Sequence, residues 1–539
     1  MSDVALECAA DLVVIDAVVY GLAADSDYFH RDGAFAVKGG KVVWVGVAAP
    51  SPECLAGVGK VLDLDGAVVF PGFSDMHVHP AEGGMETRMV QLGAVADEAA
   101  LVAAVAAWAV ATPGDAWIEG AGWDAVALDG VEPLLALDVA VPDRPVFLAS
   151  ADGHSAFVNT AAMRAAGLDP ARPPRGGVID LDAQGRPTGW IRETATDVVA
   201  GAIPARSEDQ LDAAVVAGAA ELSRFGITTV IDANADGDSL AAYVRVDEAG
   251  KLPLRVYAAS EVGPEHPRSA VGRVLRMART FRSAHVRVDA VKLYLDGVVE
   301  SKTAVLLAPY ADGTNATLNY TDDELTRIAE SATRKGLQLH AHAIGDAAVR
   351  QFLDVVEAVR PPPGLPPLAA HLELIDPADI PRFATLGVVA DAQWLWAWPD
   401  PYVTKLTVPL VGERALRLYP FGELARAGAT LVGGSDWSVS TPNPWSAIEV
   451  AVTRRDPDNA DGAVLAAEQA VSLETAVRSF MGAANAAVPA SARLVEVGSL
   501  RVGSAADFVV LDRDPTTIPP AELSEVVVRE TWFEGRRVF

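Results

Sequence analysis

Two histidines separated by one residue are the strongest local chemical signal in this sequence. They stand in residues 71–80, PGFSDMHVHP. Residues two apart on an extended strand point to the same face, so His77 and His79 can direct two imidazoles into one space. Imidazole pairs are good ligands for divalent metals. Such a pair can also arise by chance, so its meaning depends on where the fold places it.

The segment between residues 71 and 485 favours a (β/α)8, TIM-like barrel, an α/β fold. Short apolar runs alternate there with alanine-rich stretches, such as 211–225, 323–335 and 347–359, that are predicted as helices. The histidine pair ends the first expected strand, and barrel active sites are built at the carboxyl ends of the strands. The eight expected strands are 73–78, 146–149, 228–232, 290–295, 337–341, 369–374, 388–392 and 430–433.

Four more expected strand ends carry side chains that a metal could use. Each could instead be structural, because a buried lysine could pair with Asp296 and a core histidine could be hydrogen-bonded to the backbone. Their common position at one end of the barrel favours a single shared site. They are Lys292 in strand four, His340 and His342 in strand five, His371 in strand six and Asp436 after strand eight.

Both ends of the chain have the sequence pattern of short strands separated by turns. Residues 11–70 contain several such runs, and 507–511 and 526–538 repeat the pattern. We therefore expect one small β-sandwich domain built from both chain termini. The expected domains are 1–70 for the first part of the sandwich, 71–485 for the barrel with insertions near 85–137 and 170–193, and 486–539 for the second part of the sandwich.

Composition excludes several classes of protein. The 539 residues are 50% hydrophobic, which is enough for a large core and rules out intrinsic disorder. The net charge of −29 repels nucleic acids and anionic lipid surfaces, so neither is an expected partner. Cys8 and Cys54 are the only cysteines, too few for a cysteine-only zinc site. Because signal-peptide and membrane-spanning patterns are lacking as well, a cytoplasmic location is expected.

The order of the candidate ligands resembles that of the amidohydrolase superfamily of metal-dependent hydrolases. Several short sequence motifs are similar to those of the branch that includes N-substituted formamide deformylase and many "amidohydrolase 3" proteins. The resemblance extends over nearly the whole chain. The runs that carry it are 122–124 (GWD), 152–159 (DGHSAFVN), 189–193 (GWIRE), 296–304 (DGVVESKTA), 342–348 (HAIGDAA) and 502–511 (VGSAADFVVL).

The resemblance implies one or two divalent metals, with zinc the first choice for an imidazole-rich site. It also implies that Lys292 is carboxylated by carbon dioxide. A separate physical argument supports this, because a lysine amine in an apolar setting has a lowered pKa and is then nucleophilic. The implied ligands are His77, His79 and Asp436 for the more buried metal, His342 and His371 for the more exposed one, and carboxylated Lys292 as the bridge.

Other residues are expected around these ligands. His340 lies on the same face as His342, but the family's sequence motif places the metal ligand directly before residues 343–346 (AIGD). His340 and Asp296 are therefore expected behind the ligands, in contact with them rather than with a metal.

The substrate side of the site is predicted from aromatic and polar residues. His154 would hydrogen-bond the developing oxyanion, and the alternative is a structural histidine in a loop. Trp394 and Trp396 follow strand seven at alternate positions, so they either line an apolar pocket or pack under an insertion. Trp123 and Asp152 complete the expected substrate contacts. Because Trp394 stands where this branch usually has proline, the substrate of the named deformylase is not carried over.

The resulting prediction is a hydrolase for an amide-type C–N bond, such as an N-acyl amine, an N-formyl amine or a cyclic amide, in a small and fairly apolar molecule. Asp436 would take a proton from water and pass it to the leaving nitrogen. A lactone or ester hydrolase could use the same site. A deaminase is disfavoured by Lys292 and by the lack of a glutamate beside His342, and a noncatalytic binding protein would typically lose ligands. A homodimer is expected because twofold assemblies are frequent.

Overall fold

The computed structural model describes residues 10–21, 33–114, 116–124, 128, 130–151, 155–174, 177–263 and 267–539. Its contacts divide the chain into two compact units, one made of Met1–Pro80 with Ala219–Phe539 and the other of Ala81–Gly218. Both stretches predicted as insertions lie within the second unit. The expected domain limits at residues 70 and 485 stay predictions.

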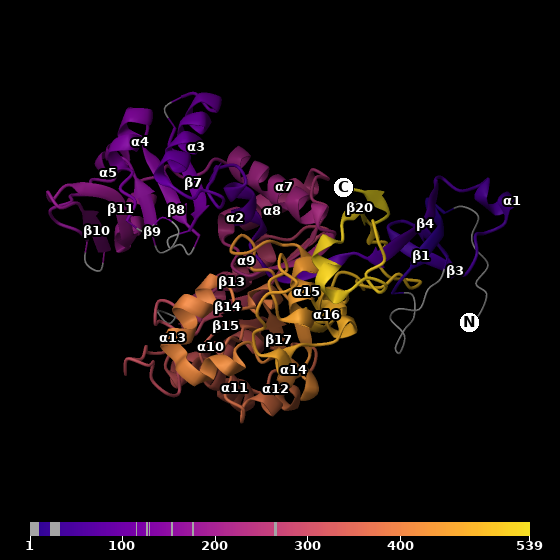
Figure 1. The fold of residues 1–539 in the computed structure, drawn as a ribbon. Helices are drawn as coiled ribbons and strands as arrows, with labels where there is room; N and C mark the ends of the chain where they lie inside the picture. The colour runs from indigo at the N-terminus through magenta and orange to yellow at the C-terminus, as the bar shows by residue number, and fades with distance from the viewer. Residues whose placement is uncertain are drawn as a thin grey trace. The chain divides into compact units, whose positions relative to one another are not determined.

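Eight parallel strands of the first unit form one sheet that curls into a nearly closed barrel (Figure 1). The predicted TIM-like barrel is confirmed as a nearly closed sheet of eight parallel strands. In chain order the strands are β5 (Phe73–Val78), β12 (Ile227–Asp232), β13 (Arg255–Glu261), β14 (Val286–Tyr294), β15 (Gln338–Ala343), β16 (Leu368–His371), β17 (Val389–Ala392) and β18 (Leu431–Gly433).

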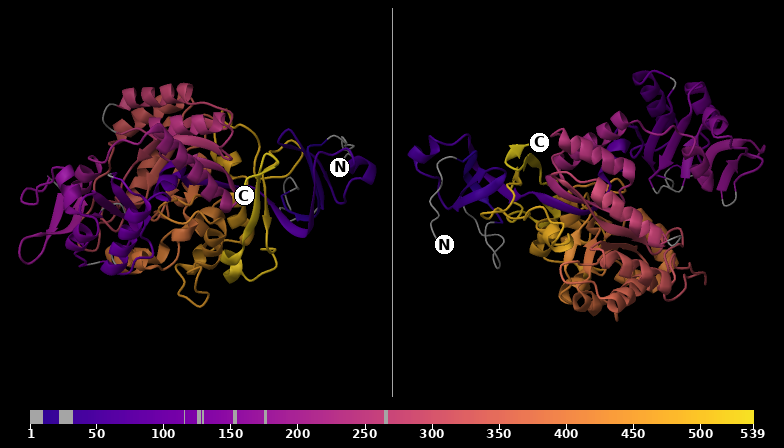
Figure 2. Two further views of the ribbon diagram at one scale, coloured as in Figure 1. Left: turned by 90° about the horizontal axis from the view of Figure 1, so that it is seen from above. Right: turned by 180° about the vertical axis from the view of Figure 1, so that it is seen from behind.

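Helices alternate with these strands along the chain and lie outside the sheet (Figures 1 and 2). In α10, Thr321 and Glu324 form a capping box, and buried Leu325, Ile328 and Ala332 recur at helical spacing on one face. Among the described residues, none of the helices combines the length and apolar character that a bilayer crossing requires. The main helices are α7 (Glu208–Arg224), α8 (Gly237–Glu248), α9 (Pro267–Thr280), α10 (Asp322–Thr333), α11 (Asp346–Val359), α12 (Ile380–Leu386), α14 (Phe421–Arg426), α15 (Pro444–Thr453) and α16 (Leu473–Phe480).

One predicted barrel strand is wrong and one barrel strand was missed. Residues 146–149, expected as the second barrel strand, lie in β8 (Val146–Ser150) of the other unit's sheet. The missing member is β13, which begins with Arg255 and ends with Glu261. Its apolar run between these charges is only four residues long, so the hydrophobic pattern was weak. Arg255 is nevertheless buried, because its guanidinium pairs with Asp507 and with Glu534, the latter at 2.8 Å.

The barrel closes between β5 and β18 through the loop that follows β18. The backbone N–H of Asp436 donates to the carbonyl of His77 at 2.7 Å, and that of His79 donates to the carbonyl of Trp437 at 2.8 Å. The N–H of Ser435 donates to Oδ1 of Asp75 at 3.0 Å. These bonds hold the loop that carries Asp436 against the strand that carries the histidine pair.

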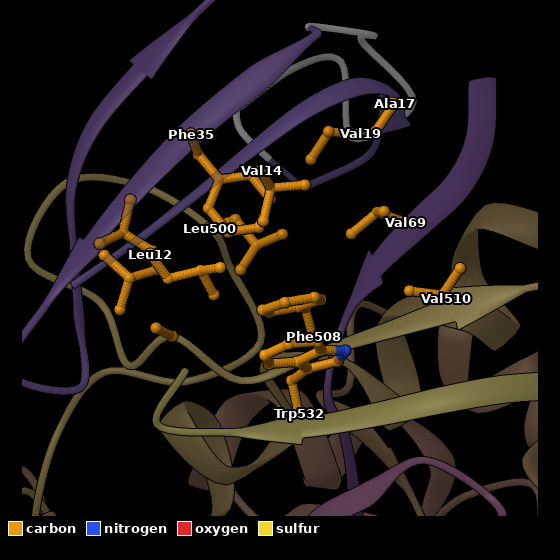
Figure 3. Packing of buried hydrophobic residues seen from close by; sticks show 13 residues of the cluster. Leu12, Val14, Ala17, Val19, Phe35, Val69, Leu500, Phe508, Val510 and Trp532 are labelled. Carbon is orange, nitrogen blue, oxygen red and sulfur yellow. The ribbon is translucent and has the colours of Figure 1, made fainter. Parts of the chain in front are cut away.

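Both chain ends contribute to one seven-stranded sheet, in the order β21-β20-β19-β4-β1-β2-β3. Aromatic rings from both ends pack in its core (Figure 3): Phe508 stacks on Trp532 with centroids 5.1 Å apart, and Phe35 meets Phe508 edge-on at 5.2 Å. A two-layered sandwich stays a prediction. The strands are β1 (Leu12–Val19), β2 (Ala34–Lys38), β3 (Lys41–Gly46), β4 (Val61–Pro71), β19 (Phe508–Leu511), β20 (Val528–Phe533) and β21 (Arg536–Arg537).

The second unit has a six-stranded sheet of its own, in the order β10-β11-β9-β8-β7-β6. Trp123, Phe157 and Trp190 form its aromatic core, with Trp123 stacked on Phe157 at 4.1 Å. The elements are β6 (Val90–Gln91), β7 (Ile118–Trp123), β8, β9 (Ser155–Val158), β10 (Gly177–Leu181), β11 (Pro187–Glu193), α3 (Glu98–Ala111), α4 (Leu134–Ala140), α5 (Thr160–Ala165) and α6 (Thr194–Ala200).

Candidate metal centre

The barrel brings the predicted ligands together at the carboxyl ends of its strands. Parallel pairing sets Lys292 beside His340 and Tyr294 beside His342, and it sets Ala343 beside His371. The closing loop adds Asp436 next to β5. Active sites of this fold are built at this end because the strand ends converge there.

One compact group contains the histidine pair and the aspartate. Nε2 of His79 lies 3.1 Å from Oδ1 of Asp436, and Nε2 of His77 lies 3.6 Å from the same oxygen. Nζ of Lys292 lies 3.1 Å from Nε2 of His77. Two imidazole nitrogens and one carboxylate oxygen at such separations can act as ligands of one divalent cation.

A second pair of imidazoles lies beside this group. The ring centroids of His342 and His371 are 4.4 Å apart, and those of His77 and His371 are 4.8 Å apart. His371 has a left-handed backbone with φ of 76°, and its N–H donates to Oε1 of Gln393 at 2.7 Å. Such a conformation is costly for a residue with a Cβ and is typical of functional sites. Nδ1 of His371 is buried and has no hydrogen-bond partner among the described residues.

The site's electrostatics favour neutral, metal-competent side chains. Burial lowers the pKa of His77 and His371 well below the usual range and that of His342 to about 4. Burial also lowers the pKa of Lys292 to about 8, against the opposing effect of nearby carboxylates. His79 differs: burial acts to lower its pKa, but the hydrogen bond to Asp436 and the charges of Asp436 and Asp232 together outweigh burial and raise the pKa.

The donor set therefore fits a divalent metal. Neutral imidazoles supply nitrogen lone pairs, and the buried, unpartnered Nδ1 of His371 is an atom that a metal would satisfy. A lysine with a lowered pKa is more often a neutral amine, which is the form that reacts with carbon dioxide.

A second compact group consists of His77, His340 and Asp391, and one of its three members, Asp391, was missed by the sequence analysis. Nδ1 of His77 lies 3.2 Å from Oδ2 of Asp391 and 3.0 Å from Nε2 of His340. His340, which was expected behind the ligands, contacts His77, and its role stays a prediction. Asp391 was not singled out, although a single acid inside the apolar strand β17 is the same kind of signal as Lys292 in β14.

Asp296 supports the loops beside the site. Its carboxylate accepts the N–H groups of Val305 at 3.0 Å, Ile344 at 3.1 Å and Gly345 at 2.8 Å. Oδ1 lies 3.9 Å from Nε2 of His342. Asp296 thus orders the turn that follows His342.

The structure separates the two tryptophans after strand seven. They lie in a 3-10 helix, η1 (Trp394–Trp396). Trp394 is buried, and its Nε1 donates to Oγ of Ser479 at 3.0 Å. Trp396 stacks on His371 with centroids 5.3 Å apart and planes 2° from parallel. Of the two, only Trp396 lies against a candidate ligand, and a substrate contact of either ring stays a prediction.

Three further residues were predicted to contact the substrate: Asp152, His154 and Trp123. Asp152 and His154 lie outside the described residues, so their roles stay predictions. Trp123 is fully buried in the core of the second unit, and its Nε1 donates to the carbonyl of Leu148 at 2.8 Å. An indole with no exposed surface and a satisfied N–H packs as a core residue there, which is not the expected substrate contact.

This chain is similar to known proteins over most of its length. The model of the Amidohydrolase family matches residues 60–539. The structure of an uncharacterized metal-dependent hydrolase from Pyrococcus horikoshii OT3 is 26% identical, covers 94% of this chain and 99% of its own, and superposes with a TM-score of 0.77. YtcJ of Bacillus subtilis is 29% identical over 89% of this chain and 90% of its own. N-substituted formamide deformylase of Arthrobacter pascens is 28% identical over 97% of each chain.

Proposed function

The chain belongs to the amidohydrolase family of metal-dependent hydrolases, and from that premise we propose that it hydrolyses an amide-type C–N bond in a small molecule. The observation that carries the proposal is the convergence of His77, His79 and Asp436 on one point at the barrel mouth, with Lys292 within 3.1 Å of His77. Ligands that were separated along the chain meet where barrel enzymes place their chemistry.

Zinc is the proposed metal, as one ion or two. When bound, it lowers the pKa of a coordinated water and polarises a carbonyl. His77, His79 and Asp436 would hold one ion, and His342 and His371 the other. Lys292, as a carbamate, would supply one oxygen to each.

Asp436 is the proposed proton carrier. Oδ1 contacts Nε2 of His79 at 3.1 Å, so the carboxylate already lies among the ligands. It would take the proton of the attacking water and deliver it to the leaving nitrogen, which must be protonated to depart as an amine. His154 is proposed to hydrogen-bond the developing oxyanion, and Asp152 to contact the substrate.

A fairly apolar substrate is proposed from the mouth of the site. Trp396, stacked on His371, gives the ligand region one aromatic wall. The similarity to N-substituted formamide deformylase supports N-formyl and N-acyl amines as the first compounds to try. A cytoplasmic homodimer without nucleic acid or membrane partners completes the proposal.

A lactone or ester hydrolase is the alternative that the same donors allow, because a polarised carbonyl does not require nitrogen as the leaving atom. A deaminase is less favoured, since the residues after His342 are Ala-Ile-Gly-Asp and offer no glutamate. A noncatalytic protein would have no need for this complete donor set. Each alternative predicts a different active compound in one panel of amides, lactones and amino-heterocycles.

The deciding experiment measures bound metal by elemental analysis, together with hydrolysis of N-formyl and N-acyl arylamines. Wild type is compared with Lys292→Ala and with the control Lys302→Ala, an exposed lysine paired with Asp312. We expect nearly two metals in wild type and in the control, with metal and activity both falling in Lys292→Ala. A single metal that is unaffected by the mutation would refute the bridging carbamate. Metal-free, inactive protein would refute the hydrolase.

A further inference from the structure

The two nitrogens of the His77 ring face different groups of side chains. Nε2 points to the proposed metal position, 3.1 Å from Nζ of Lys292 and 3.6 Å from Oδ1 of Asp436. Nδ1 points into the barrel, 3.2 Å from Oδ2 of Asp391 and 3.0 Å from Nε2 of His340. All three members of the inner group are buried, with Asp391 and His340 each 0% exposed. The surroundings of Nδ1 therefore decide which nitrogen is free for a metal.

Asp391 is the member of this group that determines which nitrogen of His77 is free for a metal. Its Oδ2 lies 3.2 Å from Nδ1 and can accept a proton carried there, while Nε2 of the same ring faces Lys292 and Asp436, an orientation that matches a proton on Nδ1. Nε2 then carries the lone pair that a metal ligand needs. His340 alone would not decide, because its Nε2 can either donate to Nδ1 of His77 or accept from it.

His340 then takes the complementary state. If Nδ1 of His77 carries the proton, Nε2 of His340 must accept, and the proton of His340 lies on its own Nδ1. That atom is buried and has no hydrogen-bond partner among the described residues. His340 thus packs against His77, with ring centroids 4.8 Å apart, and its Nε2 is a second acceptor, beside Asp391, for the proton on Nδ1 of His77.

Close packing holds Asp391 in place. A Cβ at Gly434 would lie 2.6 Å from Cβ of His77, 2.7 Å from Oδ1 of Asp391 and 2.8 Å from Nε2 of Gln393. No side chain fits between β5 and β17 at this point. The absence of a Cβ at Gly434 is what lets the carboxylate reach the ring.

We propose that Asp391 is a positioning residue of the metal centre, which fixes the tautomer and orientation of His77, with His340 as its auxiliary partner. This inference rests on the proposed function, because it takes His77 as a metal ligand. Asp391 touches neither substrate nor metal in this role. It acts by presenting Nε2 of His77 to the metal.

The test measures zinc affinity of the full-length protein by competition with a chromophoric chelator, after the metal has been removed. Asp391→Asn keeps the shape but offers an NH2 that can donate to Nδ1, which would move the proton to Nε2. We expect zinc to bind about 10- to 100-fold more weakly and His340→Gln to have a smaller effect. Asp289→Asn is the matched control, because Asp289 is another buried barrel carboxylate, on β14, and its Oδ2 has no hydrogen-bond partner among the described residues. Its affinity should equal that of wild type.

Several outcomes would overturn the inference. Zinc affinity of Asp391→Asn within twofold of the control would do so. The loss of one whole metal equivalent at saturating zinc, with the remaining affinity unchanged, would mean that His77, His340 and Asp391 bind an ion of their own. His77→Asn separates the two proposals. If this variant binds zinc as wild type does, the proposed metal centre fails. If His77→Asn loses zinc while Asp391→Asn does not, only the proposed role of Asp391 is refuted.

A measurement on wild type keeps the test independent of mutant folding. The ring-nitrogen chemical shifts of 15N-histidine-labelled, metal-free protein report which nitrogen of His77 carries the proton, with His77→Asn identifying the signals. A proton on Nδ1 is expected. A proton on Nε2 would overturn the inference.

Discussion

Nε2 of His79 lies 3.1 Å from Oδ1 of Asp436 although 357 residues separate them in the chain. The contact crosses the seam of the barrel, where β5 meets the loop after β18. Two backbone hydrogen bonds, Asp436 to His77 and His79 to Trp437, flank it. Closure of the barrel and assembly of the metal centre are therefore one structural event.

Asp436→Asn tests the proton carrier at this seam. The amide keeps the shape of the side chain but cannot take up the proton, so kcat should fall about 10²- to 10⁴-fold at saturating metal. Steady-state hydrolysis is measured on samples whose metal content is known, because Asp436 is also a proposed ligand. Activity within tenfold of wild type at equal metal content would contradict the role.

Gly434→Ala tests how tightly the seam is packed. The added methyl group would meet His77 and Asp391 at 2.6 to 2.7 Å, so one of them must move. We expect a loss of about 1 to 3 kcal/mol in the free energy of unfolding, together with weaker zinc binding. Gly237→Ala is the control, since its Cβ meets nothing within 4 Å. Equal stability of the two variants in denaturant titrations would show that a methyl group fits at Gly434 without displacing its neighbours, which would contradict the prediction.

His285 predicts a pH-dependent contribution to stability. Its ring nitrogens pair with Asp247 at 2.6 Å and with Glu534 at 3.4 Å. Hydrogen bonds to Asp247 and Glu534 raise its pKa from 6.5 to about 9. Because the folded pKa is raised, the stabilisation is present in full below pH 6.5 and is lost as the pH rises through about 9.

The corresponding experiment compares wild type with His285→Asn by thermal unfolding at several pH values. The variant should lose about 1 to 2 kcal/mol near pH 6, an estimate between those for exposed and buried ion pairs. The difference should shrink by pH 10. The pKa of Glu534 is lowered to about 2 by His285, so this carboxylate stabilises above pH 4.5 and loses its contribution only as the pH falls through about 2. A difference that stays constant between pH 6 and pH 10 would be inconsistent with a charged His285.

Trp396 and Trp394 should respond in opposite ways to truncation. Trp394→Ala removes a fully buried indole and should lower the free energy of unfolding by about 3 to 5 kcal/mol. Trp396→Ala removes the ring stacked on His371 and should chiefly raise KM for aromatic amides. Thermal unfolding and steady-state kinetics on both variants check this division. An unchanged KM in Trp396→Ala would refute the proposal that Trp396 forms an aromatic wall beside the substrate.

The barrel and the types of its candidate ligands could be predicted because both are local properties. Alternating apolar runs and helical stretches identified seven of the eight barrel strands. The eighth, β13, escaped because Arg255 and Glu261 interrupt its apolar run, and Arg255 is compensated by Asp507, which lies 252 residues further along the chain. A counter-ion so distant has no local signature in the sequence.

Residue types that could bind a metal, and their position at strand ends, could be inferred from the sequence, because side-chain period and chemistry depend on neighbours along the chain. The inward-facing nitrogen of His77, its contact with Asp391 and the left-handed backbone of His371 became visible only in the folded chain. These features depend on strands that lie opposite one another in the nearly closed barrel. Their distances are set by packing between residues hundreds of positions apart, which no local pattern encodes.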